Sequence, residues 1–437
     1  MSETDSPNVL WVVVDCLRDD ALSTNGYHRP TTEPIDDRLA ADFVRFENAC
    51  TQSGFTLNVI SSLVTGTYPT THGVLRWSDT FPEDVPAYAD AIADSSLPPA
   101  TAIPGMNFVT EEWGVDRAFD RVHNLEEAKG TRACEQARAG EIREEAERVV
   151  TGADGFNAML WFFDLHEPWL SDRAFDGDNP KRDSYDTELR YVAEQLDELF
   201  ATLEAAGRYE DTLVIVTGDH GDIFTEHQNL PWNRYTALAE RLPLARRILY
   251  GNGYVGHIGR PFVEELVDVP LFVKLPGSEH GGTCVEGQVE LVDLLPTILD
   301  VAGVSELETV EGETLLPKVR GEEDGKAYVR AEMSPEPVAG FFRMVRGTEY
   351  KYLRHDPPSL GDIQNPARDT LLYLARRFLT PEEVLVERAD EHRNLVDDRP
   401  EVAADLRRVM DGWAQDVDAD AGISEERREE LEQLGYL

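Results

Sequence analysis

Basic residues are scarce in this sequence, and lysine is the scarcest of them. Lysine and arginine together number 41, of which only six are lysine, against 84 aspartate and glutamate residues, and the formal net charge is −43. A surface of this charge repels polyanions, so we expect neither nucleic acid nor an anionic membrane as a partner. The chain is still 41% hydrophobic, which argues against disorder. A folded acidic protein fits a halophilic, high-salt cytoplasm, where ions screen the repulsion between like charges.

Cysteine pairs and long apolar runs are also missing. The four cysteines, at positions 16, 50, 134 and 284, form no CxxC pair, so neither a disulfide framework nor a zinc site made of thiolates is indicated. No run approaches the roughly 18 apolar residues of a membrane span. The first residues, MSETDSPN, lack the basic and apolar regions of a secretion signal. These absences predict a soluble, cytoplasmic protein with reduced thiols.

Short apolar runs alternate with helical patterns over the first three quarters of the chain. This alternation predicts an α/β fold with a doubly wound, mostly parallel sheet flanked by helices. The pattern changes near residue 320, so we expect one domain of residues 1–320 and a small C-terminal α+β domain of residues 321–437. The expected strands are 8–15, 43–49, 157–164, 212–219 and 269–275, and the expected helices are 33–43, 83–95, 185–206 and 292–304.

Two of these strands end in an aspartate, Asp15 in VVVDCLRDD and Asp219 in VTGDHGD. In a doubly wound sheet ligands bind outside the carboxyl ends of the strands, so two carboxylates there can converge on one hard cation. His220, beside Asp219, adds a nitrogen ligand. One such aspartate alone would more often be a helix cap or a turn residue. Two of them, one followed by histidine, predict a metal site.

Thr56 directly precedes the apolar helical pattern LNVISSLVTG, which ends at Gly66. This position suits an N-cap. It also brings a hydroxyl group to a helix N-terminus, where free N–H groups favour a phosphate or a sulfate. The pattern alone leaves both roles open.

A family resemblance rests on the order of the motifs along the chain. They read PNVLWVVVDCLRDD, SLVTGTYPTTHG, FFDLHEPW, VTGDHGDIFTEH and VELVDLLPTILDVAGV, and in this combination the chain resembles the sulfatase family of the alkaline phosphatase superfamily. The resemblance covers nearly the whole chain. It implies a metal-dependent hydrolase that acts on sulfate or phosphate esters of small molecules.

The chain departs from the family's sequence pattern at the position of the nucleophile. Sulfatases carry C-x-P-S-R or S-x-P-S-R, in which the first residue is oxidised to formylglycine. Here Thr56, Asn58, Val59 and Ile60 stand at the four defined positions. Threonine cannot become the aldehyde, so no formylglycine is expected. In other branches of the superfamily threonine attacks directly, and the resemblance to them implies that Thr56 is the nucleophile.

The same branches imply a ligand set for one divalent ion, Ca²⁺, Mg²⁺ or Mn²⁺. Carried over, it consists of Asp15, Thr56, Asp219 and His220. Cys16 stands where many sulfatases have a second acid, so one oxygen ligand is missing. Asp20 lies close enough in sequence to be considered in its place.

Two further histidines match family positions. His166, in DLHEPW, would contact the substrate or protonate the leaving group, and His257, in GHIGRP, would hold a substrate oxygen. Two alternatives to the hydrolase remain open. One is a soluble phosphotransferase of the same superfamily, and the other is a non-catalytic binding protein that keeps the fold.

Overall fold

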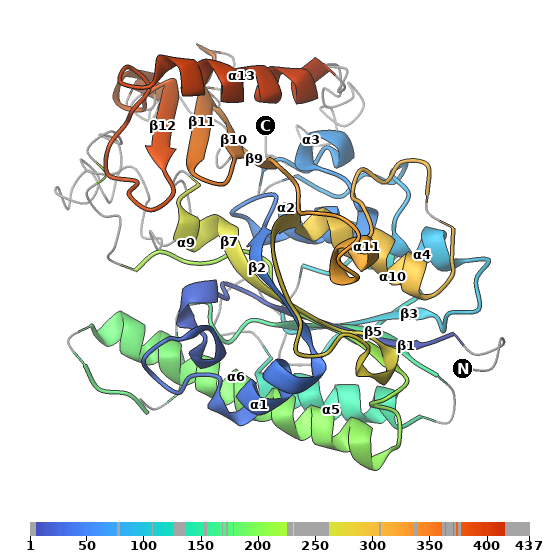
Figure 1. The fold of residues 1–437 in the computed structure, drawn as a ribbon. Coiled ribbons are helices and arrows are strands. Elements are labelled where there is room, and N and C mark those ends of the chain that lie inside the picture. The colour runs from blue at the N-terminus through green and yellow to red at the C-terminus, as the bar shows by residue number, and fades with distance from the viewer. Residues whose placement is uncertain are drawn as a thin grey trace.

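The computed structural model describes most of residues 6–415. It leaves out 77–78, 107, 126–136, 153–154, 168, 172–173, 178, 225–229, 231–261, 306, 335–339, 361–362, 364–369, 371–372 and 375–376. The described residues form a large sheet with helices on both faces and a smaller sheet beside it (Figure 1). The predicted α/β architecture with a small C-terminal α+β part is therefore confirmed, while the domain boundary near residue 320 stays a prediction.

The large sheet has eight strands in the order β4–β3–β5–β1–β6–β7–β2–β8. Neighbouring strands from β4 to β6 are parallel, and so are β2 and β8, whereas β7 runs antiparallel to both β6 and β2. The bounds are β1 Asn8–Val14, β2 Val44–Cys50, β3 Ala100–Pro104, β4 Arg121–Val122, β5 Asn157–Phe162, β6 Thr212–Gly218, β7 Asp268–Lys274 and β8 Cys284–Glu290.

Strand β1 shows why the chain forms a sheet that is covered on both faces. Its side chains alternate between two apolar clusters: Val9, Trp11 and Val13 enter one cluster, and Leu10 and Val12 enter the other. A strand buried on both faces reads as a continuous apolar run rather than as an alternation, as NVLWVVV does. The sequence of β1 thus specifies a central position in the sheet.

Helices pack on both faces of this sheet (Figure 1). One face carries α1 (Glu33–Asp42), α5 (Ala139–Val150) and α6 (Pro180–Ala205), and the other carries α2 (Thr56–Thr65), α4 (Tyr88–Ile92), α10 (Leu294–Val301) and α11 (Leu316–Val319). The start of α6 is well specified, because the Asn179 side chain accepts hydrogen bonds from the amides of Lys181 and Arg182 and Pro180 occupies the first turn.

All predicted strands and helices overlap observed ones, but several elements were missed. The short strands β3 and β4, the edge strand β8 and the helix α5 were not predicted. β8 was missed because its first residues alternate between exposed and half-buried positions, so it lacks the apolar run of the central strands. The expected helix at 83–95 is reduced to Tyr88–Ile92.

The small sheet is antiparallel, in the order β12–β11–β10–β9. A helix, α13 (Pro400–Gln415), lies along it (Figure 1). Its strands are β9 Val329–Met333, β10 Phe341–Arg346, β11 Tyr350–Asp356 and β12 Glu383–Glu387.

Buried ion pairs join this small sheet to α9 (Glu264–Val267) and β7 of the large one. Lys351 of β11 has no exposed side-chain surface and lies 3.0 Å from Glu264, and it also pairs with Glu391. Arg346 of β10, equally buried, lies 2.7 Å from Asp268. These charges lower the pKa of the Glu264 carboxyl against the opposing effect of burial. We name these five residues the junction cluster.

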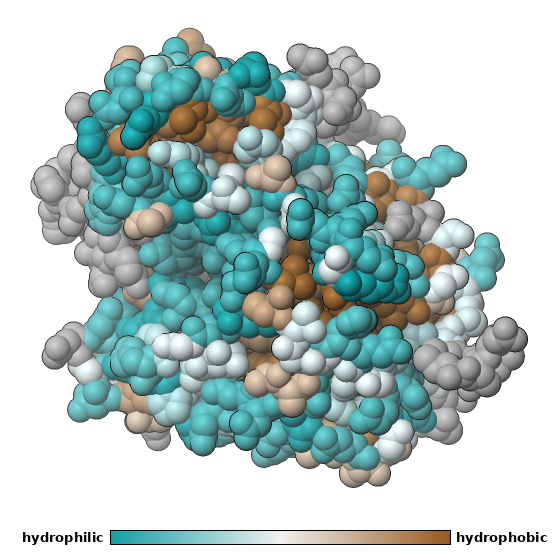
Figure 2. Space-filling view, in the orientation of Figure 1, coloured by the Kyte–Doolittle hydropathy of each residue, from teal (hydrophilic) through white to brown (hydrophobic). Residues whose placement is uncertain are grey.

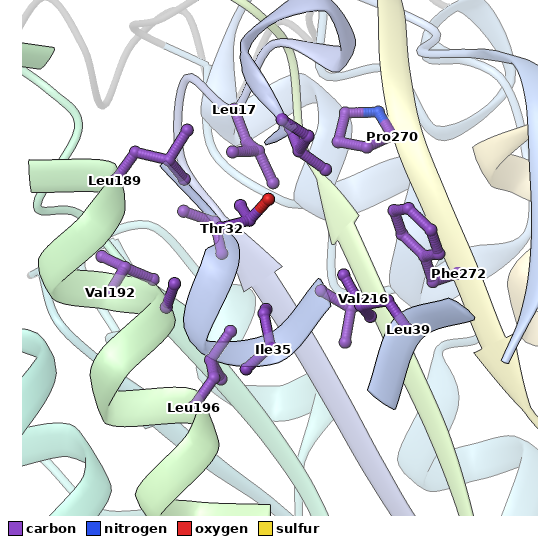
Figure 3. Close-up of a pocket in the computed structure, with 13 residues that line it drawn as sticks. Leu17, Thr32, Ile35, Leu39, Leu189, Val192, Leu196, Val216, Pro270 and Phe272 are labelled. Carbon is purple, nitrogen blue, oxygen red and sulfur yellow. The ribbon is translucent and has the colours of Figure 1, made fainter. Parts of the chain in front are cut away.

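A small cavity of about 20 Å³ lies between α1, α6 and the sheet (Figure 3). Its lining is apolar except for Thr32, and includes Ile35, Leu196 and Phe272. A buried water needs two to four polar partners, which this lining does not supply. The cavity is therefore a packing gap and not a ligand site.

The surface is mostly hydrophilic on the face drawn in Figure 2. Among the described helices, none combines the length and the apolar character that crossing a bilayer requires.

The junction cluster predicts a large stability cost for removing its lysine. We expect Lys351→Met to lower the free energy of unfolding by about 3–5 kcal/mol, because the buried carboxylate of Glu391 loses its cation and Glu264 loses one of its cations. The matched control is Arg393→Met, since Arg393 is 71% exposed and pairs with Asp398 at the surface; its cost should stay below about 1 kcal/mol. Denaturant unfolding in high salt measures both. Equal costs would contradict a special role for the junction cluster.

Candidate active site

Two strand ends bring the acidic residues of the site together. β1 and β6 are parallel neighbours, and their last residues, Val14 and Gly218, are in register. The next residue of each strand is an aspartate, Asp15 and Asp219, and neither has any exposed surface. The two carboxylates predicted from the strand ends therefore lie side by side at the carboxyl edge of the sheet.

The Thr56 side chain points to this edge. Its Oγ1 donates a hydrogen bond to Asp15 Oδ2 at 2.9 Å and lies 3.3 Å from His220 Nε2. The N-cap of α2 is Phe55, and Thr56 is the first helical residue, with no side-chain capping bond at this helix end. The N-cap reading of Thr56 is therefore wrong by one residue, because its hydroxyl is held by the strand ends instead of by the amides of α2.

His220 has a defined orientation. Its Nδ1 lies 2.8 Å from the carbonyl oxygen of Gly221, which can only accept, so Nδ1 carries the hydrogen. Nε2 therefore presents its lone pair toward the Thr56 hydroxyl. Metal-binding histidines are commonly oriented by a backbone carbonyl in this way.

Asp219 is held by the backbone. Its Oδ1 accepts hydrogen bonds from the amides of Cys16 at 3.1 Å and of His220 at 2.7 Å. Two glycines allow the close packing around it. A Cβ at Gly218 would lie 2.7 Å from the Leu17 carbonyl oxygen, and a Cβ at Gly221 would lie 1.9 Å from that of Glu265.

The two remaining carboxylate oxygens fit a cation. Asp15 Oδ1 and Asp219 Oδ2 are buried and have no hydrogen-bond partner, although buried charges are normally paired. Burial and the charge of Asp219 raise the pKa of Asp15 far above its ordinary value, so the pair resists full ionisation on its own. Two carboxylates, an imidazole nitrogen and a hydroxyl form a donor set that suits a divalent ion. The predicted ligands Asp15, Thr56, Asp219 and His220 therefore fit such an ion.

Cys16 adds a fifth possible ligand, which the sequence reading had taken as a missing one. Its Sγ, a carboxylate oxygen of Asp15 and a ring nitrogen of His220 all lie within 4.8 Å of one another, and all three residues are buried. Burial and the charge of Asp15 raise the pKa of the Cys16 thiol well above its usual range. The sequence feature that could have identified Cys16 as a ligand is its position directly after Asp15 at the end of β1.

Asp20 is engaged elsewhere. Its two carboxylate oxygens accept hydrogen bonds from Arg18 at 2.8 and 2.7 Å, and the Arg18 guanidinium also donates to the Asp222 carbonyl oxygen. Arg18 is buried, with its guanidinium 5.0 Å from the Phe224 ring centroid. Asp20 thus serves as the counter-ion of a buried arginine.

His166 lies at the same edge of the sheet. It follows the end of β5, which pairs with β1 in parallel, and it is half-buried. Its Nδ1 lies 2.7 Å from the Glu167 carbonyl oxygen, so Nδ1 carries a hydrogen. His257 lies outside the described residues, and its role stays a prediction.

The residues that follow Thr56 at the other motif positions, Asn58, Val59 and Ile60, pack inside the protein. Asn58 donates to the Leu75 carbonyl oxygen at 2.9 Å, and Ile60, at the position of the family's arginine, is fully buried in the apolar cluster that also contains Val59. His72 is also structural, because its ring contacts Ser62 and the Val74 amide. Burial lowers the pKa of His72 to about 3, so this ring is neutral.

The comparisons with known proteins agree with the fold. The sulfatase family model matches residues 7–304. The Delta 4,5-hexuronate-2-O-sulfatase of Bacteroides thetaiotaomicron is 26% identical over 215 residues, 48% of this chain and 39% of that protein. Lipoteichoic acid synthase 1 of Bacillus subtilis is 30% identical over 133 residues, 30% of this chain and 17% of that protein. These matches span less than half the length of either relative.

Solved structures resemble nearly the full length of this chain. The phosphonate monoester hydrolase of Agrobacterium radiobacter superposes with a TM-score of 0.68 at 18% identity, and the alignment covers 96% of this chain and 98% of that one. At this identity the likeness shows the fold alone.

The close packing at Gly221 predicts that a larger residue at this position destabilises the protein. We expect Gly221→Ala to destabilise the protein by about 1–3 kcal/mol, because the new methyl group meets the Glu265 backbone. The control is Gly412→Ala in α13, where a Cβ meets nothing within 4 Å and where alanine should stabilise the helix by about 0.5–1 kcal/mol. Thermal unfolding in high salt compares the two variants. A Gly221→Ala protein as stable as the wild type would refute this packing argument.

Proposed function

Since the chain belongs to the sulfatase family, we propose that it is a metal-dependent hydrolase of sulfate or phosphate esters in which Thr56 is the nucleophile. The observation that carries the proposal is the Thr56 hydroxyl, which lies 2.9 Å from Asp15 Oδ2 and 3.3 Å from His220 Nε2. A helix cap would instead direct its oxygen to the amides of its own helix. The side chain is 8% exposed, so the hydroxyl is buried but not sealed from solvent.

Asp15, Asp219, His220 and Thr56 would hold the metal ion. When bound, a divalent ion lowers the pKa of a coordinated hydroxyl and neutralises charge on the transferred group. Asp15 Oδ1 and Asp219 Oδ2 support this assignment, because they are buried and no hydrogen bond satisfies them.

The first step transfers the sulfuryl or phosphoryl group to Thr56. The hydroxyl oxygen attacks the sulfur or phosphorus atom, and the bond to the ester oxygen breaks. The hydroxyl proton passes to Asp15 Oδ2, which already accepts its hydrogen bond. Thr56 is the first residue of α2, so the amides of the first helical turn lie near the group that is transferred and favour its negative charge.

His166 would protonate the departing alcohol. Its Nδ1 hydrogen is held by the Glu167 carbonyl oxygen, so the second proton of the charged ring lies on Nε2 and can be given to the leaving oxygen. In the second step water attacks the ester of Thr56, which releases sulfate or phosphate and restores the hydroxyl. An alcohol in place of that water would make the protein a phosphotransferase.

This reaction differs from that of formylglycine sulfatases in its nucleophile, which is the unmodified side chain of Thr56. A threonine ester needs no oxidised aldehyde, so the protein should be active as translated. The relatives whose names state a sulfated sugar substrate support a small-molecule ester as the substrate, and His257 would contact one of its oxygens.

Replacement of Thr56 tests the nucleophile. We expect Thr56→Ala to reduce turnover by about 10³-fold or more, whereas Thr56→Ser retains measurable turnover because it keeps the hydroxyl. A panel of aryl sulfates, phosphate monoesters and phosphate diesters, assayed in high salt with several divalent metals, identifies the preferred ester. Added alcohols reveal any transferase activity.

The control is Thr65→Ala at the other end of α2, where Thr65 Oγ1 bonds only to residues around the end of this helix. It should keep wild-type turnover. Full activity of Thr56→Ala, or a formylglycine found by mass spectrometry, would refute the scheme. A folded wild type without turnover on any ester would favour a non-catalytic binding protein.

Replacement of His166 tests the general acid. We expect His166→Gln to slow the hydrolysis of alkyl esters by about 10²–10⁴-fold. Nitrophenyl esters should be affected much less, because nitrophenolate leaves without a proton. Rates measured against the pKa of the leaving alcohol separate the two roles. Equal loss across all leaving groups would assign His166 to substrate binding instead.

A further inference from the structure

We propose that Cys16 is a ligand of the same metal ion, and that the site therefore selects a thiophilic divalent cation such as Zn²⁺ over Ca²⁺ or Mg²⁺. This inference rests on the proposed metal site and concerns which ion it holds. It revises the expectation of Ca²⁺, Mg²⁺ or Mn²⁺, which counted only oxygen and nitrogen donors.

The first argument is the distance between the donor atoms. The Cys16 sulfur, a carboxylate oxygen of Asp15 and a ring nitrogen of His220 lie within 4.8 Å of one another. Zinc binds such atoms at about 2.0–2.3 Å in a tetrahedron, so two of its ligands lie roughly 3.3–3.8 Å apart. The three donors thus need to move by less than about 1 Å each to share one ion.

The second argument is the backbone of Cys16. In an extended strand successive side chains point to opposite faces, so Asp15 and its neighbour would normally point apart. Cys16 instead has a positive φ of 60°, a left-handed conformation that is uncommon for residues with a side chain. Its amide donates to Asp219 and its carbonyl oxygen accepts from Tyr185. These bonds hold the bend that brings the thiol beside Asp15.

The third argument points independently to a cation at this place. Asp15 Oδ1 and Asp219 Oδ2 are fully buried without a hydrogen-bond partner. One ion bound by the Cys16 thiolate and by these two oxygens would satisfy all three groups.

The chemistry of the donors then decides the ion. Thiolates favour Zn²⁺ and other soft or borderline cations, whereas Ca²⁺ and Mg²⁺ favour oxygen ligands. On binding, the thiol proton is released to solvent as the metal–sulfur bond forms. One cysteine among oxygen and nitrogen donors therefore distinguishes this site from an all-oxygen one.

Cobalt provides the test, because Co²⁺ replaces Zn²⁺ and its spectrum reports its ligands without any turnover. We expect the wild type with Co²⁺ to show visible bands of the bound ion together with the near-ultraviolet charge-transfer band of a cobalt–thiolate bond. Cys16→Ser should lose the charge-transfer band, and Cys16→Asp should keep the visible bands alone. Cys284→Ser, which alters an exposed cysteine, should match the wild type.

Competition titrations measure selectivity. Cys16→Asp should shift the ratio of Zn²⁺ to Ca²⁺ affinity toward Ca²⁺ by at least about 10-fold, and thermal unfolding of each variant checks that it is folded. Visible bands without the charge-transfer band in the wild type would overturn the role of Cys16 and leave the proposed function intact. No cobalt binding by folded wild type would overturn both, and a charge-transfer band that survives in Cys16→Ser would overturn the assignment of the sulfur.

Discussion

The burial of two carboxylates beside each other is the constraint on which the site depends. Asp15 and Asp219 have no exposed surface, and each has one oxygen without a hydrogen-bond partner. Charges in this setting are costly unless an opposite charge compensates them. Their neighbours satisfy only part of this need, through the hydroxyl of Thr56 and two backbone amides. The cation that we propose for this site would compensate the two remaining oxygens.

The fold maintains this arrangement with rigid elements. The two aspartates follow adjacent parallel strands whose register is fixed over seven residue pairs, and both strands are buried on both faces. The glycine at 221 lets the backbone of α9 approach the site. Thr56, the proposed nucleophile, is carried by α2, whose ten residues are all buried. Sites on packed strands and helices hold their geometry better than sites on loops, so these elements keep Asp15, Thr56 and Asp219 in place.

The sequence was sufficient for the fold and for the convergence of Asp15, Thr56 and Asp219 at one sheet edge, while their roles stay predictions. The strand ends at Asp15 and Asp219 were predictable, because apolar runs that stop at an acid mark the carboxyl edge of a parallel sheet. The orientation of Thr56 was not, because the pattern cannot separate an N-cap from the first helical residue. Cys16 was read as a lost ligand, since its left-handed backbone is invisible in sequence. The reversed direction of β7 was also missed, because an apolar run specifies burial and not direction.

The junction cluster has a consequence for the salinity in which the protein works. Exposed ion pairs weaken as salt concentration rises, whereas buried pairs are screened much less. Lys351 and Arg346 have no exposed side-chain surface, and their partners Glu264 and Asp268 are only 19% and 22% exposed, so salt screens these ion pairs less than those at the surface. The acidic exterior, in contrast, needs counter-ions to relieve a net charge of −43. The exterior and this interface thus differ in their response to dilution: repulsion between surface charges increases, while the ion pairs between the two sheets change little.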